Sequence, residues 1–196
     1  MKQGGYLRED TMKKIVTNIK EFQYFYPYTV TLVGAQTKTR TNYMACAWHT
    51  ALSFNPPLFG VLISKKRLTH EVISEAKEFT VNFISYERVK LSAQMGRKSG
   101  HDIDKLSEFK VKLSASKIIK SPLIEEAYVS FECRVADIRP YGDHDLFVGE
   151  ILAVHEEECF DKLGVLDTRK LNPLLYLGKD FYVTTNPATV KHVLPD

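Results

Sequence analysis

The sequence is poor in cysteine and contains no long apolar run. Its 196 residues include three cysteines, Cys46, Cys133 and Cys159, with no CxxC spacing and no even number for a disulfide framework. We therefore expect free thiols and a reducing compartment. No stretch approaches the ~20 apolar residues of a membrane helix, and the charged N-terminus lacks the apolar core of a signal peptide. These absences predict a cytoplasmic protein with no membrane partner.

The common catalytic signatures are missing as well. The chain has no GxGxxG, P-loop, HExxH or GxSxG motif, and its six histidines show no ligand spacing with the cysteines, so we expect no metal site. The 27 basic and 24 acidic residues are spread along the chain and leave a net charge of only +3. No field of one sign is available to attract nucleic acid, and we expect no such partner.

What the chain does contain is a β pattern. Residues 128–138 alternate apolar and polar side chains, a turn follows at 141–145, and residues 146–155 read as a central strand, so a long antiparallel hairpin is expected. Further strands are expected at 28–34, 43–52, 58–63 and 79–84, and short helices at 69–76, capped by Thr69, and 86–95.

The lack of βαβ alternation favours an antiparallel barrel over a Rossmann sheet. We predict a mainly β chain with short helices, folded as an antiparallel Greek-key barrel. One domain is expected, in which residues 1–24 are a leader packed on the barrel, 25–160 form the barrel and 161–196 extend it.

Two basic segments are candidates for an anion site. Ser64, Lys65, Arg67 and Thr69 lie between an apolar strand and a helix start, which is where free N–H groups and positive charge can hold a phosphate. Arg97, Lys98 and Lys105 form the second segment. Taken alone, the residues of both segments favour solvated loops and leave the anion site open as the alternative.

A third candidate is the segment 42–50. Asn42, Ala45, Cys46 and Ala47 are small or turn-forming residues next to Trp48, so this backbone is suited to lie against a flat ligand, although a plain core strand fits too. His144, between two aspartates in the predicted hairpin turn, is suited to acid–base work or to simple exposure.

These segments together resemble the flavin reductase-like family of FMN-binding split barrels, over about residues 25–160. The matching pieces, in order, are YPYTV (26–30), TNYMACAW (41–48), LSFNPPL (52–58), RLT (67–69), EFTVNF (78–83), ECRV (132–135) and GDHDLFVGE (142–150). The resemblance implies a homodimeric split barrel with FMN between its subunits.

The resemblance also implies how the cofactor is held. The isoalloxazine would lie along residues 42–50, which include His49 and Thr50, and the phosphate at Ser64, Lys65, Arg67 and Thr69. Asn82 belongs to the matching pieces and is taken as a cofactor-binding position. Arg97, Lys98 and Lys105 would help to hold a phosphate of either nucleotide, and His144 would lie beside the flavin and nicotinamide as the catalytic candidate.

The implied activity is an NAD(P)H-dependent FMN reductase, with NADH or NADPH left open as donor and FAD left open as the flavin. The alternatives are a flavoredoxin-type electron carrier with a redox partner protein, and a split barrel without a redox role. Many relatives have a hydroxyl residue before the tryptophan, where this chain has Ala47. A side-chain hydrogen bond to the flavin is therefore expected to be missing there.

Overall fold

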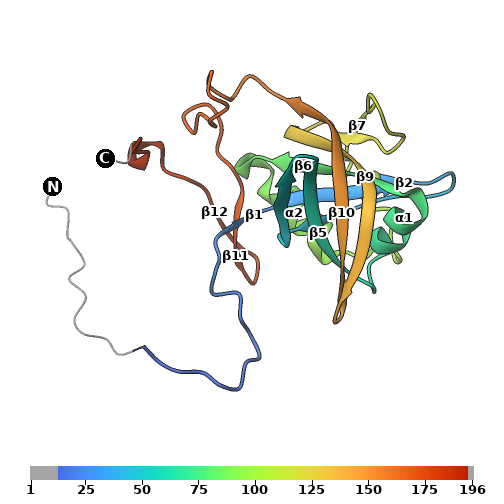
Figure 1. Cartoon of the computed structure of the whole chain (residues 1–196), viewed down its shortest axis with the longest axis horizontal. Helices are drawn as coiled ribbons and strands as arrows, with labels where there is room; N and C mark the ends of the chain where they lie inside the picture. Colours follow the sequence, from blue (N-terminus) through green and yellow to red (C-terminus); the bar gives the residue numbers. More distant parts are fainter. Residues whose placement is uncertain (1–12, 194–196) are drawn as a thin grey trace, which may run out of the picture.

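A seven-stranded antiparallel sheet forms the body of the protein, which the computed structural model describes from residue 13 to residue 193 (Figure 1). Its strands, in spatial order, are β3 (Thr41–Cys46), β2 (Thr31–Gln36), β6 (Glu78–Ile84), β9 (Ala127–Tyr141), β10 (His144–Glu156), β5 (Pro57–Ser64) and β4 (His49–Phe54). The end strands β3 and β4 are joined in the chain only by Ala47 and Trp48. The sheet therefore curls until its ends approach, which confirms the mainly β, antiparallel split barrel.

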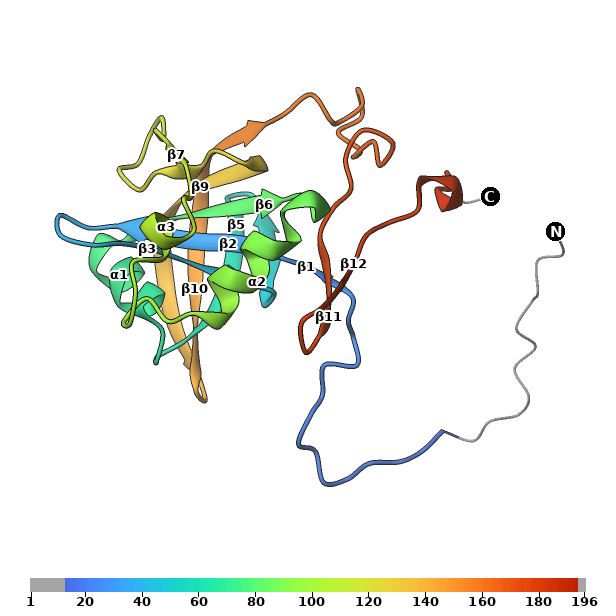
Figure 2. The same cartoon turned by 180° about the vertical axis from the view of Figure 1, so that it is seen from behind.

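Short elements cover this barrel. The helix α1 (Leu68–Ala76) packs on β2, and both α2 (Val89–Arg97) and α3 (Lys105–Glu108) contact β3. A small separate sheet stands beside the barrel (Figure 2). It consists of β1 (Tyr28–Thr29), β11 (Leu175–Gly178) and β12 (Phe181–Val183); the remaining elements are β7 (Leu113–Ser114), β8 (Leu123–Ile124) and the 3-10 turns η1 (Tyr86–Arg88) and η2 (Pro187–Thr189).

The barrel interior is apolar and buried. Phe79 and Phe147 come from strands of the sheet, and Val72 and Ile73 reach them from α1, all with no exposed surface. Burying a side chain of this size contributes roughly 1.5–3 kcal/mol each. The core therefore fixes α1 on the barrel, together with the strand ends that precede it.

The hairpin of β9 and β10 confirms the strongest strand pattern in the sequence. The two strands pair from His144 opposite Tyr141 to Glu156 opposite Val129, and Gly142 takes a φ of 62° in the turn between them. On its other edge β10 pairs with β5, which sets His144 opposite Ser64. The hairpin tip thus lies where the first basic segment begins.

The prediction of one continuous strand at 43–52 is wrong. The chain turns at Ala47 and Trp48, and the halves of the segment become β3 and β4, at opposite ends of the sheet order. At the turn the Trp48 carbonyl accepts a hydrogen bond from the Leu62 N–H at 2.9 Å. Because β-favouring residues run through the turn without a glycine or proline, composition does not mark the break.

The first predicted helix also differs in its cap. The residue at the N-cap of α1 is Arg67, whose side chain makes no capping bond. The Thr69 hydroxyl instead accepts a hydrogen bond from Asn42 Nδ2 at 2.6 Å. The N–H groups in the first turn of α1 are therefore left without a side-chain cap. The second predicted helix becomes η1 followed by α2, which continues through Gly96 to Arg97.

The two ends of the chain behave differently. Residues 1–12 of the predicted leader and residues 194–196 lie outside the described residues. Residues 13–24 are exposed and run outside the barrel (Figure 1), with Phe22 near Trp48 at 5.8 Å between ring centroids. Residues after 160 return to the side of the barrel, where β11 pairs with β1 in the small separate sheet.

Within residues 13–193, no helix combines the length and the apolar character that crossing a membrane requires.

Candidate functional site

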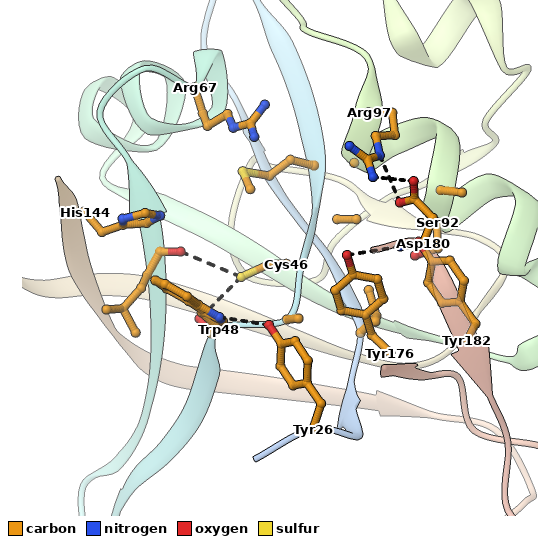
Figure 3. Close-up of a pocket in the computed structure, with 17 residues that line it drawn as sticks. Tyr26, Cys46, Trp48, Arg67, Ser92, Arg97, His144, Tyr176, Asp180 and Tyr182 are labelled. Carbon is orange, nitrogen blue, oxygen red and sulfur yellow. Dashed lines mark hydrogen bonds and ion pairs between the residues drawn. The ribbon is translucent and has the colours of Figure 1, made fainter. Parts of the chain in front are cut away.

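A pocket of about 290 Å³ opens at the seam of the barrel, where the chain passes from β3 to β4 (Figure 3). Its floor is the backbone from Met44 to Trp48, and the small side chains of Ala45 and Ala47 leave that backbone accessible to a flat ligand. We call this space the wide compartment. It is also lined by Tyr26, Val30, Leu62, Arg67, Ser92, Ala93, Gly96, Arg97, His144, Tyr176, Asp180 and Tyr182.

A recess of about 40 Å³ adjoins the wide compartment and shares Met44, Ala45, Arg67 and Gly96 with it. We call it the narrow compartment. The loop after α2 closes it at Gly100, where an added Cβ would stand 2.3 Å from Asn42 Oδ1. Only glycine allows the backbone to approach so closely here. We call the two compartments together the slot; the narrow compartment is its small enclosed end.

Three cations, Arg67, Lys98 and Lys105, line the narrow compartment. Lys105 is only 4% exposed, and its Nζ donates to the Met95 carbonyl at 3.1 Å. Burial, together with the positive charge of Arg67, lowers the pKa of Lys105 to about 8. Within residues 13–193, none of these three side chains has a carboxylate at ion-pair distance. Because an unneutralised buried cation is costly, this end of the slot is suited to receive an anion.

The start of α1 adds to this arrangement. Arg67 and Thr69 both line the narrow compartment, and the uncapped first turn between them carries the positive end of the helix dipole. Asn42 holds Thr69 in place through its 2.6 Å hydrogen bond. A small oxyanion in the recess would therefore meet backbone N–H groups as well as the cations that line it.

Aromatic side chains dominate the other end of the slot. The Trp48 ring lies 4.9 Å from the His144 ring, and its Nε1–H donates to Tyr26 Oη at 3.0 Å (Figure 3). His144 Nδ1 lies 2.7 Å from Asp143 Oδ1, and this hydrogen bond lowers the pKa of the Asp143 carboxyl. Asp143 thus orients the imidazole beside the tryptophan, where a second planar molecule can stack.

The wall opposite His144 comes from α2 and the β11–β12 hairpin. The Arg97 guanidinium forms a two-pronged ion pair with Asp180, with Nε and Oδ1 2.9 Å apart. The Asp180 N–H donates to Tyr176 Oη at 3.4 Å. Arg97 is therefore already neutralised by the protein, unlike Arg67 and Lys105, and it ties the hairpin to α2.

The structure brings most of the sequence-predicted site residues into the slot. The wide compartment contains Ala45, Cys46, Ala47, Trp48, Arg97 and His144. The narrow compartment contains Asn42, Thr69, Lys98 and Lys105, and Arg67 lines both.

Five predicted residues lie elsewhere. The break after β3 turns His49 into the core against Phe59, where burial lowers the pKa of the imidazole to about 4, and leaves Thr50 exposed on β4. Ser64 lines neither compartment. Lys65 points to Asp145, with Nζ and Oδ1 3.3 Å apart. The Asn82 amide is fully buried; one of its four hydrogen bonds goes to Thr80 within β6, and the others tie β6 to Leu32, Ile124 and Ser130.

The sequence reasoning missed the tyrosine side of the pocket. Tyr26 entered only as part of the YPYTV match and not as a site residue, and Tyr176, Asp180 and Tyr182 lie in a segment expected only to extend the barrel. Between 128 and 156 residues separate them from Trp48 or Tyr26 in the sequence, so local pattern gives no sign that they meet. The only available signal was the high density of tyrosine at both ends of the chain.

Comparisons with known proteins agree with this geometry. The flavin reductase like domain matches residues 23–185. An uncharacterized protein of Pyrococcus abyssi is 37% identical over 164 residues, covering 83% of this chain and 93% of the relative. A more distant match, 27% identical over 127 residues and covering 65% of this chain and 64% of the relative, is an FMN reductase (NADH) of Stutzerimonas stutzeri.

Solved structures show the same fold. An FMN-binding protein from Thermus thermophilus superimposes with a TM-score of 0.82 at 31% identity, covering 94% of this chain and 99% of that one. A flavoredoxin from Methanosarcina acetivorans gives a TM-score of 0.79 at 35% identity, covering 89% and 92%. Since the family match spans most of the chain, the protein belongs to the flavin reductase like domain family.

Proposed function

We propose that the protein binds FMN in the slot, with the phosphate in the narrow compartment and the isoalloxazine ring in the wide one. The observation that carries this proposal is the pair of unneutralised cations, Arg67 and buried Lys105, at the closed end of a slot with a flat, small-residue floor. Related proteins named for FMN binding support the choice of ligand. The residues present fit FMN, because its phosphate would supply the negatively charged partner that Arg67 and Lys105 lack among the described residues.

We propose further that the protein is an NAD(P)H-dependent flavin reductase. FMN, when bound, supplies the hydride chemistry, and the chain supplies placement. The backbone N–H groups between Ala45 and Trp48 would stabilise negative charge on the pyrimidine side of the ring. His144, fixed by Asp143 beside Trp48, would orient a nicotinamide over the open face.

Anaerobic addition of NADH or NADPH to the FMN-loaded protein tests this activity. We expect at least one of the two nucleotides to bleach the visible absorption of the bound flavin. If neither nucleotide bleaches a flavin that dithionite does bleach, the reductase assignment is wrong while FMN binding stands. The same comparison identifies the preferred donor, and loading with FAD shows whether the slot accepts it.

The second candidate function is electron transfer in the manner of a flavoredoxin. The 35% identity to the flavoredoxin from Methanosarcina acetivorans favours it. In this case FMN stays bound through gel filtration, NADH and NADPH leave it oxidised, and a reduced redox protein supplies the electrons. The bleaching experiment therefore separates the two functions.

We also infer that the protein works as a homodimer. Large apolar side chains are exposed on the edge strand β4, where Phe54 is 100% and Leu52 43% exposed, and on the N-terminal segment, where Ile15 is 85% exposed. Such surfaces are typical of contacts between subunits. Light scattering of the FMN-loaded protein should give twice the mass of the chain, and a monomeric mass would contradict this.

A further inference from the structure

We propose that the Tyr26 hydroxyl is a hydrogen-bond donor to the carbonyl-bearing pyrimidine edge of the bound flavin and raises its reduction potential. This inference rests on the proposed FMN site and adds a residue that neither the sequence nor the relatives' names assign to it. It concerns the wide compartment only, at the end away from Arg67 and Lys105.

The Tyr26 side chain is held in one place. Its ring packs against Phe25 at 4.9 Å and Tyr176 at 5.4 Å between centroids, and its oxygen receives the Trp48 Nε1–H at 3.0 Å. Figure 3 shows the hydroxyl end of Tyr26 directed toward Trp48. A ligand that lies on the backbone from Ala45 to Trp48 therefore meets this hydroxyl in a fixed position.

The hydroxyl still has a proton to donate. A phenol offers one donor and accepts through its oxygen, and Trp48 uses the accepting side, since an indole nitrogen only donates. No acceptor for the Tyr26 O–H lies within hydrogen-bond distance among residues 13–193. Burial raises the pKa of Tyr26, so the group keeps its proton at neutral pH.

Among the residues that the structure describes on the floor beside Tyr26, no other side chain has a proton free to donate. Ala45 and Ala47 have no polar atoms, and the buried Cys46 thiol already donates to the Trp48 carbonyl at 3.4 Å. Tyr176 lies farther toward α2, where its oxygen accepts from the Asp180 N–H. At the Trp48 end of the floor, the phenol of Tyr26 therefore remains as the side-chain group with a proton to donate.

The effect on the potential follows from charge. Two-electron reduction places negative charge on the N1 and C2-carbonyl region of flavin, and hydrogen bonds to a charged acceptor are roughly twice as strong as those to a neutral one. A donor at this edge therefore stabilises the reduced form more than the oxidised form. A donor at N5 would have the opposite effect, because N5 is an acceptor only in the oxidised ring.

The test is the midpoint potential of bound FMN in Tyr26→Phe, measured by anaerobic spectroelectrochemistry of the loaded protein. We expect the ratio of affinities for reduced and oxidised FMN to fall about tenfold, which lowers a two-electron potential by about 30 mV. Affinity for oxidised FMN should change less than threefold. Tyr24→Phe, at a side chain that is 83% exposed, is the matched control and should leave the potential unchanged.

A rescue variant separates hydrogen bonding from packing. The double variant Tyr26→Phe with Ala47→Ser returns a hydroxyl to the same end of the floor and should recover part of the lost potential. An unchanged or raised potential in Tyr26→Phe would overturn the inference while leaving the FMN site intact. Failure of the wild-type protein to bind FMN would overturn both the proposed function and this inference.

Discussion

Replacing Arg67 with alanine and Lys105 with methionine together should weaken FMN binding by about 100- to 10,000-fold. Each cation would make a charge-assisted contact with the phosphate, and such contacts are worth about 1.5–3 kcal/mol each. Every 1.4 kcal/mol corresponds to a tenfold change in affinity. Trp48, the single tryptophan of the chain, lines the slot, so quenching of its fluorescence measures the dissociation constant directly.

Two controls distinguish this loss of FMN affinity from unfolding: the melting temperature of the variant, and substitution of a cation outside the slot. Burial lowers the pKa of Lys105 in the folded chain, so its ammonium is less favourable there than in the unfolded chain at neutral pH. Lys105→Met should therefore leave the melting temperature unchanged or raise it. Lys65→Met removes a cation that pairs with Asp145, outside both compartments, and should change FMN affinity less than threefold. Equal losses in both variants would place the phosphate elsewhere.

Affinity for FMN should also fall as the pH rises through about 8. Without ligand, the Lys105 ammonium has a pKa of about 8, because burial and Arg67 both disfavour the charged form. The phosphate binds the protonated form, so above this pH binding must include uptake of a proton. Affinity should drop on the order of tenfold between pH 8 and 9.5. Titrations of Trp48 fluorescence with FMN across pH 7–9.5 measure this slope.

Two controls assign the slope to Lys105. Riboflavin has the same ring system without the phosphate, so its affinity should not show this dependence. In Lys105→Met the FMN slope should disappear over the same range, although Arg67 remains charged throughout. A slope that persists in Lys105→Met would mean that another group near the slot titrates.

The sequence was sufficient to predict the mainly β architecture, but not the turn between β3 and β4 at the seam of the barrel. The alternation in 128–138 predicted β9 because a long strand with one buried face shows the period of two clearly. At 43–52 the same kind of residues continue through a change of direction at Ala47 and Trp48. That turn is fixed by the contact of Trp48 with β5, which is a tertiary interaction and leaves no local signal.

The candidate site was likewise predictable where it depends on local sequence and not where it depends on tertiary contacts. Arg67, Thr69 and the floor residues lie within or next to recognisable segments, and the structure brings them together. The prediction of His49 as a cofactor-binding residue failed because side chains alternate between the two faces of a strand. A shift of one residue after the turn therefore decides whether His49 faces the pocket or the core. The tyrosine wall was missed because it combines both ends of the chain. Lys105 was named, but its burial with no carboxylate partner among residues 13–193 was not foreseeable from a short polar helix.

The affinity of the wild-type protein for FMN compared with riboflavin tests the central claim most directly. The two ligands differ only by the phosphate, which we place against Arg67, Lys105 and the first turn of α1. Titration of Trp48 fluorescence at pH 7 should show FMN binding about 100-fold or more tighter than riboflavin. Equal affinities, or no quenching by either ligand, would contradict the assignment of the narrow compartment as a phosphate site.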